Sequence, residues 1–178
     1  MPEEVSLILA EEPVRRIQFS GRPDTPRGVA VVCATKEGRL EEVGRLGILA
    51  RYHRRYEVDL SEHHTRLAAF VPAQRDGRFD CRAELRWQVC APVEVVRHRV
   101  SDGRALCHDR LLAKLSRITE QFPAAESAAA EREVNSRLGA GPLVMDEGIT
   151  VHHFAARLTP DAGLDQPAFG VTHPRESR

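Results

Sequence analysis

The clearest pattern in the chain is a strict alternation of apolar and polar residues between Phe79 and Val89. One parity is apolar and the other is polar: Phe79, Cys81, Ala83, Leu85, Trp87 and Val89 against Asp80, Arg82, Glu84, Arg86 and Gln88. Successive side chains of a strand point to opposite faces. The alternation therefore predicts one long strand with Trp87 buried and its polar face open to water or to a partner. The preceding Asp76-Gly77 is typical of a turn that requires positive φ.

Four other segments have the length and composition of strands: Gly28–Ala34, Tyr56–Leu60, Leu67–Val71 and Gly148–Leu158. The first is a continuous apolar run, and the second alternates apolar with acidic residues. We expect Leu67–Val71 to lie beside Tyr56–Leu60, its neighbour in sequence. Gly44 and Gly47 weigh against a helix over the residues that follow Leu40.

After Gly103 the apolar period changes to that of a helix. Apolar residues at steps of four and three predict an amphipathic helix that begins at Arg104 and ends at Pro123: Leu111, Leu115, Ile118 and Phe122. A second helix is predicted from about Ala124 to Leu138, with a stripe at Ala130, Val134 and Leu138. Gly139 and Gly141 favour its termination there.

Strands followed by helices, with one more strand after them, indicate an α+β fold: a mostly antiparallel sheet covered by two helices. We expect an N-terminal extension over residues 1–27, in which short apolar pieces are either strands or docked segments. The domain itself spans residues 28–160. Residues 161–178 hold prolines and few large apolar side chains, which predicts a mostly irregular tail.

Net charge and the distribution of apolar residues limit which partners and which cellular compartment we expect. The 178 residues carry 26 basic and 26 acidic side chains, a formal net charge of zero. This balance gives no reason to expect a nucleic-acid partner. The N-terminus lacks the basic and apolar regions of a secretory signal, and no apolar run approaches the ~20 residues of a membrane helix. We expect a cytoplasmic protein, peripheral to the membrane at most.

The cysteines and histidines show no motif of a catalytic or metal centre. None of the four cysteines forms a CxxC pair, and we expect free thiols, with Cys33, Cys81 and Cys90 in apolar strand positions. Cys107 lies in the first turns of a predicted helix, where the dipole can lower a thiol pKa. Cys107-His108-Asp109 has the residue types of a triad, but consecutive residues cannot converge into one. His63-His64 and His152-His153 lack helical metal-ligand spacing. We therefore expect no catalytic residue, metal or cofactor.

The densest basic and aromatic patch is Arg51-Tyr52-His53-Arg54-Arg55-Tyr56. Arginines could contact phosphate there, and tyrosines could stack on bases. Acidic residues follow directly at Glu57, Asp59 and Glu62. The patch is short, so a solvated strand is the better interpretation.

Several segments follow one another in an order and spacing shared with a known family. They are Gly38–Val43, Arg51–Leu60, Phe79–Val96, Leu111–Ile118, Ala129–Leu138 and Glu147–Leu158. Together they make the stretch from Gly28 to Asp161, roughly three-quarters of the 178 residues, resemble the SPFH or band 7 domain of stomatins, prohibitins and flotillins. Ala91 stands where that family usually has Asp. The family's hydrophobic N-terminal anchor and long C-terminal coiled coil have no counterpart in the sequence.

The resemblance implies a non-catalytic domain of proteins that scaffold membranes, form rings or regulate membrane proteases. We therefore expect a non-enzymatic assembly or adaptor subunit that binds protein, either itself or another subunit, through its sheet and helices. Its candidate interface is Arg82, Glu84 and Arg86 on the polar face of the long strand. The alternatives are a peripheral membrane scaffold or regulator of band 7 type, and a small-molecule-binding or enzymatic domain.

Overall fold

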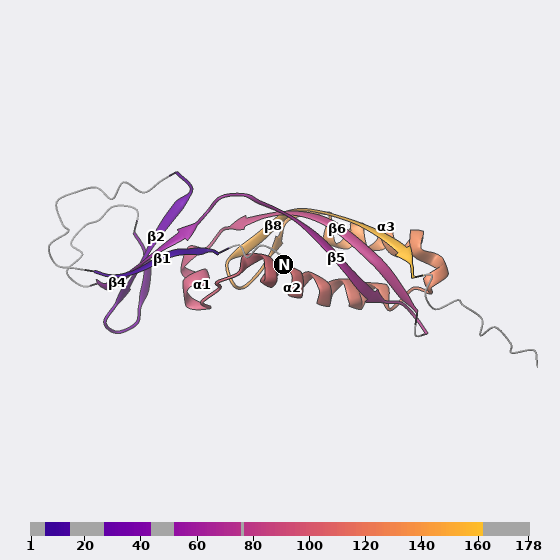
Figure 1. Cartoon of the computed structure of the whole chain (residues 1–178), viewed down its shortest axis with the longest axis horizontal. Helices are drawn as coiled ribbons and strands as arrows, with labels where there is room; N and C mark the ends of the chain where they lie inside the picture. Colours follow the sequence, from indigo (N-terminus) through magenta and orange to yellow (C-terminus); the bar gives the residue numbers. More distant parts are fainter. Residues whose placement is uncertain (1–5, 15–26, 44–51, 76, 162–178) are drawn as a thin grey trace, which may run out of the picture.

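The computed structural model describes residues 6–14, 27–43, 52–75 and 77–161. A small sheet occupies one end of an elongated molecule, and a larger sheet with most of the helical residues occupies the rest (Figure 1). The small sheet contains β1 (Ile8–Pro13), β2 (Val29–Thr35), β3 (Leu40–Glu42) and β4 (Tyr52–Asp59), in the order β1-β4-β2-β3. The large sheet contains β5 (His63–Pro72), β6 (Arg78–Val89), β7 (Leu143–Val144) and β8 (Ile149–Pro160), in the order β5-β6-β8-β7.

All strand pairs are antiparallel, and the α+β class predicted from the sequence is confirmed. The expectation of a single sheet is wrong, because the described strands form two sheets. The chain crosses from one sheet to the other at residues 60–62, so β5 pairs with β6 and not with β4. β4 is instead paired on both sides within the small sheet, by β1 and β2. β1 lies within the predicted N-terminal extension, and the predicted tail from residue 162 lies outside the described residues.

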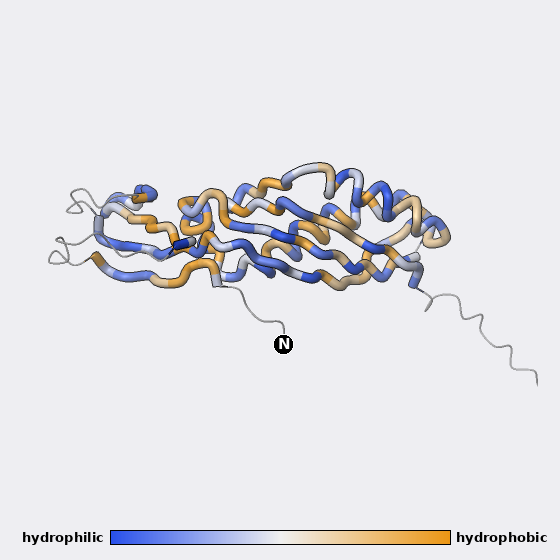
Figure 2. The backbone as a smooth tube through the Cα atoms, turned by 90° about the horizontal axis from the view of Figure 1, so that it is seen from above, coloured by the Kyte–Doolittle hydropathy of each residue, from blue (hydrophilic) through white to orange (hydrophobic). Residues whose placement is uncertain are grey.

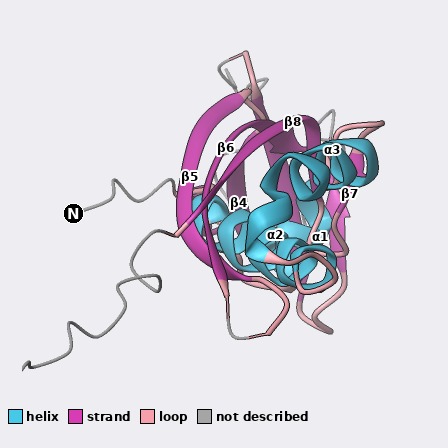
Figure 3. Cartoon of the chain, turned by 90° about the vertical axis from the view of Figure 1, so that its right-hand side faces the viewer, coloured by secondary structure: helices cyan, strands magenta, loops and turns pink. Residues whose placement is uncertain are grey.

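The helices are α1 (Pro92–Arg97), α2 (Gly103–Thr119) and α3 (Ser127–Leu138), with a 3-10 turn at Ala124–Glu126. α2 begins where the Asp102 carboxylate accepts hydrogen bonds from the backbone N–H groups of Arg104 and Ala105. It ends before the predicted Phe122. α2 contacts β5 and α3 contacts β8, so both lie against the large sheet, on one side of it (Figure 3). α1, which the apolar pattern of the sequence does not predict, contacts strands of the small sheet.

The apolar parity of the long strand faces these helices. Residues of β6 alternate between buried and exposed or half-buried from Phe79 to Val89, which confirms the predicted strand. Figure 2 shows hydrophilic and hydrophobic positions interspersed along the backbone of the molecule. Leu111, Leu115 and Ile118 of α2 and Ala130, Val134 and Leu138 of α3 supply the opposing apolar stripes. β2 is apolar from Val29 to Ala34 because it is buried on both faces: Val32 and Ala34 belong to the main core, and Val31 and Cys33 to a second cluster with Tyr52.

Trp87 is fully buried, as predicted, at a point where four parts of the chain meet. Its indole Nε1 donates a hydrogen bond to Thr65 Oγ1 of β5 at 3.0 Å, and the His63 ring stacks on it at a centroid distance of 4.4 Å. Gly103 at the start of α2 lets the ring approach the helix backbone. A Cβ atom at residue 103 would lie 2.5 Å from Trp87 Cη2 and 2.8 Å from Leu7 Cδ1.

We expect Gly103→Ala to destabilise the protein by on the order of 1–3 kcal/mol, the usual cost of overpacking a core. In an exposed helix the same substitution would stabilise by about 1 kcal/mol. Gly141→Ala is the matched control, because a Cβ there meets nothing within 4 Å, and we expect a change within about 0.5 kcal/mol. Denaturant unfolding measures both. Equal unfolding free energies for the two variants would contradict the packing of Trp87 on α2.

Candidate functional site

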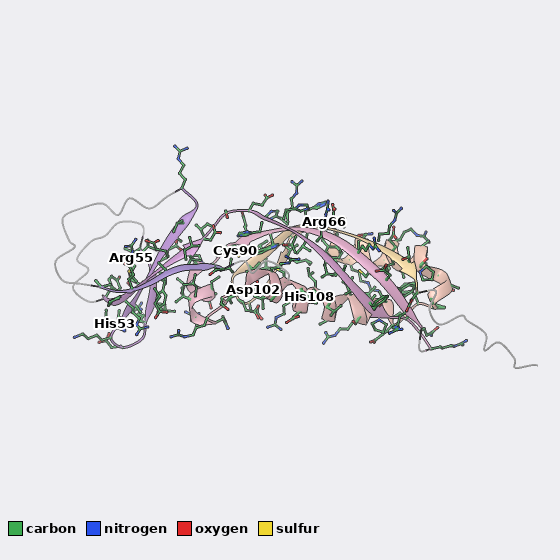
Figure 4. The ribbon with its side chains drawn as sticks, in the orientation of Figure 1. His53, Arg55, Arg66, Cys90, Asp102 and His108 are labelled. Atoms are coloured by element: carbon green, nitrogen blue, oxygen red, sulfur yellow. The ribbon has the colours of Figure 1, made fainter. Side chains whose placement is uncertain are left out.

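The candidate interface residues Arg82, Glu84 and Arg86 are all exposed on the face of the large sheet that points away from the core. We call this surface, formed by the outward-pointing residues of β5, β6 and β8, the open face. Arg66 of β5 lies on it, on the side of the sheet opposite to Asp102 and His108 at the start of α2 (Figure 4). No other described segment packs over this face, whereas α2 and α3 pack against the sheet's other side.

Strand register arranges the open face into rows of neighbouring side chains. Across β5, β6 and β8 the rows are Arg66–Glu84–Ala155, Ala68–Arg82–Arg157 and His64–Arg86–His153. Directly opposite side chains in antiparallel strands stand about 4.5–5.5 Å apart at Cβ. Each candidate residue therefore has a cross-strand neighbour that the sequence of β6 alone does not reveal.

The charges of the open face are only partly paired. Arg66 Nε lies 3.1 Å from Glu84 Oε1, and Arg82 Nη2 lies 3.4 Å from Asp80 Oδ2. Arg157 has no ion-pair partner within the part of the chain that the structure describes, and it stands beside Arg82. On the strands themselves the face carries Arg66, Arg78, Arg82, Arg86 and Arg157 against Asp80 and Glu84. Carboxylates beyond the strand ends pair with two of these arginines, Asp161 with Arg78 at 3.3 Å and Glu62 with Arg86 at 4.0 Å. Like charges directly opposite each other destabilise a sheet, so the face is electrostatically suited to a negatively charged partner.

Sequence reasoning missed the contribution of β8. Arg157 and His153 come from a strand more than sixty residues further on, and their position beside β6 follows only from the pairing. The register shifts between Arg86 and Trp87. Both His152 and His153 are consequently exposed, although neighbours in a regular strand point to opposite faces. The alternation of Phe154, Ala156 and Leu158 with Ala155, Arg157 and Thr159 was the available signal for the outward position of Arg157.

His63 and His152 make separate structural contacts. His63 lies half-buried against Trp87, with its Nε2 3.3 Å from Asp59 Oδ2. His152 Nε2 lies 3.2 Å from Glu62 Oε2 on the link between the two sheets. Within the described residues, no three His, Cys, Asp or Glu side chains gather in a way that could hold a metal ion.

The basic and aromatic patch becomes part of a strand, apart from Arg51, which lies outside the described residues. Tyr52 and Tyr56 are buried in β4, so their rings are not available to stack on bases. Arg54 and Arg55 pair with Glu11 and Glu57. These carboxylates neutralise much of the charge that the sequence suggested for phosphate contacts.

All four cysteines are free thiols, and Cys33, Cys81 and Cys107 are buried. Burial raises the pKa of Cys81 to about 11 and that of Cys107 to about 12. The suggestion that the helix start lowers the pKa of Cys107 is therefore wrong, because its sulfur lies in the core beneath the sheet. The expected apolar position of Cys90 is also wrong. Val89 occupies the inward parity, so Cys90 points outward and is exposed.

One buried carboxylate links α2 to the turn before β8. Glu147 is 7% exposed and accepts a hydrogen bond from Arg110 Nε at 3.0 Å. Burial by itself would raise the pKa of Glu147, but the Arg110 guanidinium and a backbone N–H hold it below its usual value. This pair ties the helix to the closing hairpin of the large sheet.

No described helix combines the length and the apolar composition needed to cross a bilayer. Comparison with known proteins finds neither a protein-family model nor a curated protein sequence that matches the chain.

We expect a thiol reagent to label one cysteine in the native protein, and that one to be Cys90. Cys33, Cys81 and Cys107 should react only on unfolding, because burial withholds both access and the thiolate form. Mass spectrometry before and after denaturation counts the labelled thiols, and Cys90→Ser is the control that should abolish native labelling. Native labelling of Cys107 would contradict its position in the core.

We expect Arg110→Gln to lower the melting temperature at pH 7, because Glu147 then stays buried without its cationic partner. A lowered carboxyl pKa contributes stability above the unfolded value, and this contribution is lost as the pH falls through the folded value. The difference between wild type and variant should therefore shrink below about pH 4.5, the ordinary Glu value. Arg137→Gln removes an exposed ion pair with Glu133 and should have the smaller effect. A pH-independent difference would argue against this role of Arg110.

Proposed function

We propose that the chain is a non-enzymatic assembly subunit that binds an acidic protein surface through the open face of its large sheet. The observation that carries this proposal is the row in which Arg82 and Arg157 stand side by side. Two adjacent guanidinium groups repel each other in the free subunit, and carboxylates of a partner would relieve that repulsion. The rest of the face is mostly polar, with Ala68, Phe70 and Ala155 as its exposed apolar side chains, which suits an interface selected by charge more than by apolar area.

The resemblance to the SPFH or band 7 domain supports the same proposal. Domains of that family act in assemblies, and the order of the segments that carry the resemblance runs from the small sheet to β8. The proposal takes the fold to be of that type and the partner to be protein, in the cytoplasm. The face spans three strands, so several arginines act together and single ion pairs contribute little.

Charge also predicts how the affinity of the complex depends on salt concentration. Exposed charges are screened beyond about 8 Å at physiological ionic strength. A complex held by the open face should therefore form readily at low salt and weaken as salt rises. Anionic lipid is the other surface that such arginines can bind, and flotation with phosphatidylserine vesicles separates it from protein.

Arg157→Glu is the sharpest test of the open face. The substitution places a carboxylate opposite Arg82 in the row that holds two like charges in wild type. It should leave the melting temperature unchanged or raise it slightly, because an opposite-charge pair adds about 0.2–1 kcal/mol to the free energy of unfolding. It should nevertheless abolish the complex that wild type forms in native extract, because the new carboxylate repels the carboxylates of an acidic partner. The measurement is the mass of the tagged protein's complex, by light scattering after extraction at low and high salt.

Arg132→Glu is the matched control, since Arg132 is an exposed residue of α3 and the charge change is identical. It should leave the complex intact. A complex that survives Arg157→Glu, or a wild type that stays monomeric and without partner in extract, contradicts the proposal. Flotation of wild type with phosphatidylserine vesicles in the absence of a protein partner would favour the membrane alternative.

A further inference from the structure

The two long edges of the large sheet differ in whether their outward backbone groups have hydrogen-bond partners. On β8, beyond its short pairing with β7, side chains of α3 meet the backbone: Asn135 Nδ2 donates to Ala156 O and Asn135 Oδ1 accepts from Ala156 N, both at 2.8 Å. Glu131 Oε2 accepts from Leu158 N at 3.0 Å. Asn135 thus makes both hydrogen bonds that a neighbouring strand residue would make, and α3 closes this edge.

β5 forms the opposite edge, and its register shows which backbone groups face outward. The hairpin bond from Ala73 N to Gly77 O marks a hydrogen-bonded pair, and the pairing with β6 continues from there without a shift. Hydrogen-bonded and non-bonded pairs alternate in an antiparallel ladder. The odd-numbered residues of β5 therefore bond to β6, and the N–H and C=O groups of the even-numbered residues point away from it: His64, Arg66, Ala68 and Phe70.

These outward groups have no backbone partner within the described residues, because β5 pairs with β6 alone and no turn or loop hydrogen bond of the described chain ends on them. All four residues are exposed. The strand has few of the features that usually protect an edge: Arg66 is its one arginine, it has no lysine and no bulge, and its only proline is its last residue, Pro72. Phe70 is 62% exposed, with the Arg78 guanidinium carbon 5.6 Å from its ring centroid.

Space for an added strand is present beside β5. A groove of about 450 Å³ runs between β5 and the first half of α2, lined by Leu67 and Leu85 from the sheet and Ala105 and His108 from the helix. The view along the sheet shows β5 at its margin (Figure 3). An extended segment could thus bond to the edge and place its inward side chains over the groove.

We propose that this edge pairs with β5 of a second copy of the chain, antiparallel and with the two-fold axis at Ala68. This deepens the proposed function, on which it rests, by naming one assembly contact and its partner. An identical edge supplies the missing donors and acceptors in the correct alternation. Ala68 meets Ala68 of the second copy, and Arg66 meets Phe70 of the second copy twice by symmetry. These three hydrogen-bonded pairs provide about six hydrogen bonds.

Charge and hydrogen bonding favour this register over those with the axis at Arg66 or at Phe70. With the axis at Ala68, each Arg66 lies between its own Glu84 and the aromatic ring of Phe70 from the second copy, an arrangement that favours a cation–π contact. Asp80 of that copy is the next residue in the same row, because Asp80 pairs with Phe70. An axis at Arg66 would place two guanidinium groups against each other. An axis at Phe70 would set Pro72, which has no N–H, against Ala68 next to the axis, whereas an axis at Ala68 sets Pro72 against His64 at the end of the ladder.

The test uses the purified chain alone, by sedimentation over roughly 1 µM to 1 mM, the range of weak to moderate affinities. Wild type should show a concentration-dependent dimer. Ala68→Lys and Ala68→Glu should each be monomeric, because each places two like charges across the axis. An equimolar mixture of the two variants should restore the dimer, since lysine then faces glutamate. Ala155→Lys, an exposed alanine of the same face on β8, should dimerise as wild type does.

A monomeric wild type across this range, an unchanged Ala68→Lys dimer, or a mixture that stays monomeric would each overturn the pairing. Failure here is distinguishable from failure of the proposed function. A purified chain that is monomeric but still forms its Arg157-sensitive complex in extract refutes the β5 contact alone. A chain that dimerises through Ala68 but forms no Arg157-sensitive complex retains the β5 contact and loses the open-face proposal.

Discussion

The indole of Trp87 occupies the point at which β5, β6, the start of α2 and the segment around Leu7 meet. Thr65 satisfies its only hydrogen-bond donor at 3.0 Å, so the largest buried side chain is placed in the core without an unpaired polar group. Gly103 gives the ring the volume that any other residue would fill. His63 covers the ring at the junction between the sheets and contacts Asp59 of β4. Because this packing fixes the inward parity of β6, it also determines which side chains form the open face.

The orientation of the sheet leaves two surfaces of different character. One is the open face, where arginines of three strands are brought together although the formal net charge of the chain is zero. The other is the backbone edge of β5. α3 closes the β8 edge through Asn135 and Glu131, and no described element does the same for β5. A polar face favours selective recognition and an unpaired edge favours directional pairing, so both surfaces suit a subunit of an assembly.

The reactive and ionisable side chains that the sequence singles out make structural contacts. Cys107 and Cys81 are buried thiols with raised pKa values, and Tyr52 and Tyr56 fill the small sheet and its core. Glu147 accepts a hydrogen bond from Arg110 just before the start of β8. A buried carboxylate with a guanidinium partner, and a thiol kept from water, stabilise the fold through satisfied contacts. The proposal of a binding role therefore rests on the surface of the large sheet.

The sequence by itself determined the local structure with the strongest periodicity. The alternation of Phe79 to Val89 predicted β6 and the burial of Trp87, and the spacing of Leu111, Leu115 and Ile118 predicted α2, because a strand and a helix each impose their own period on the apolar residues. It did not determine that β4 and β5 belong to different sheets, that α1 forms over Pro92–Arg97, or that Cys90 is exposed. Nor did it place Arg157 beside Arg82 or Asn135 against the β8 edge. These features depend on which distant segments pair, and pairing is decided by the burial of the whole core, which no local period encodes.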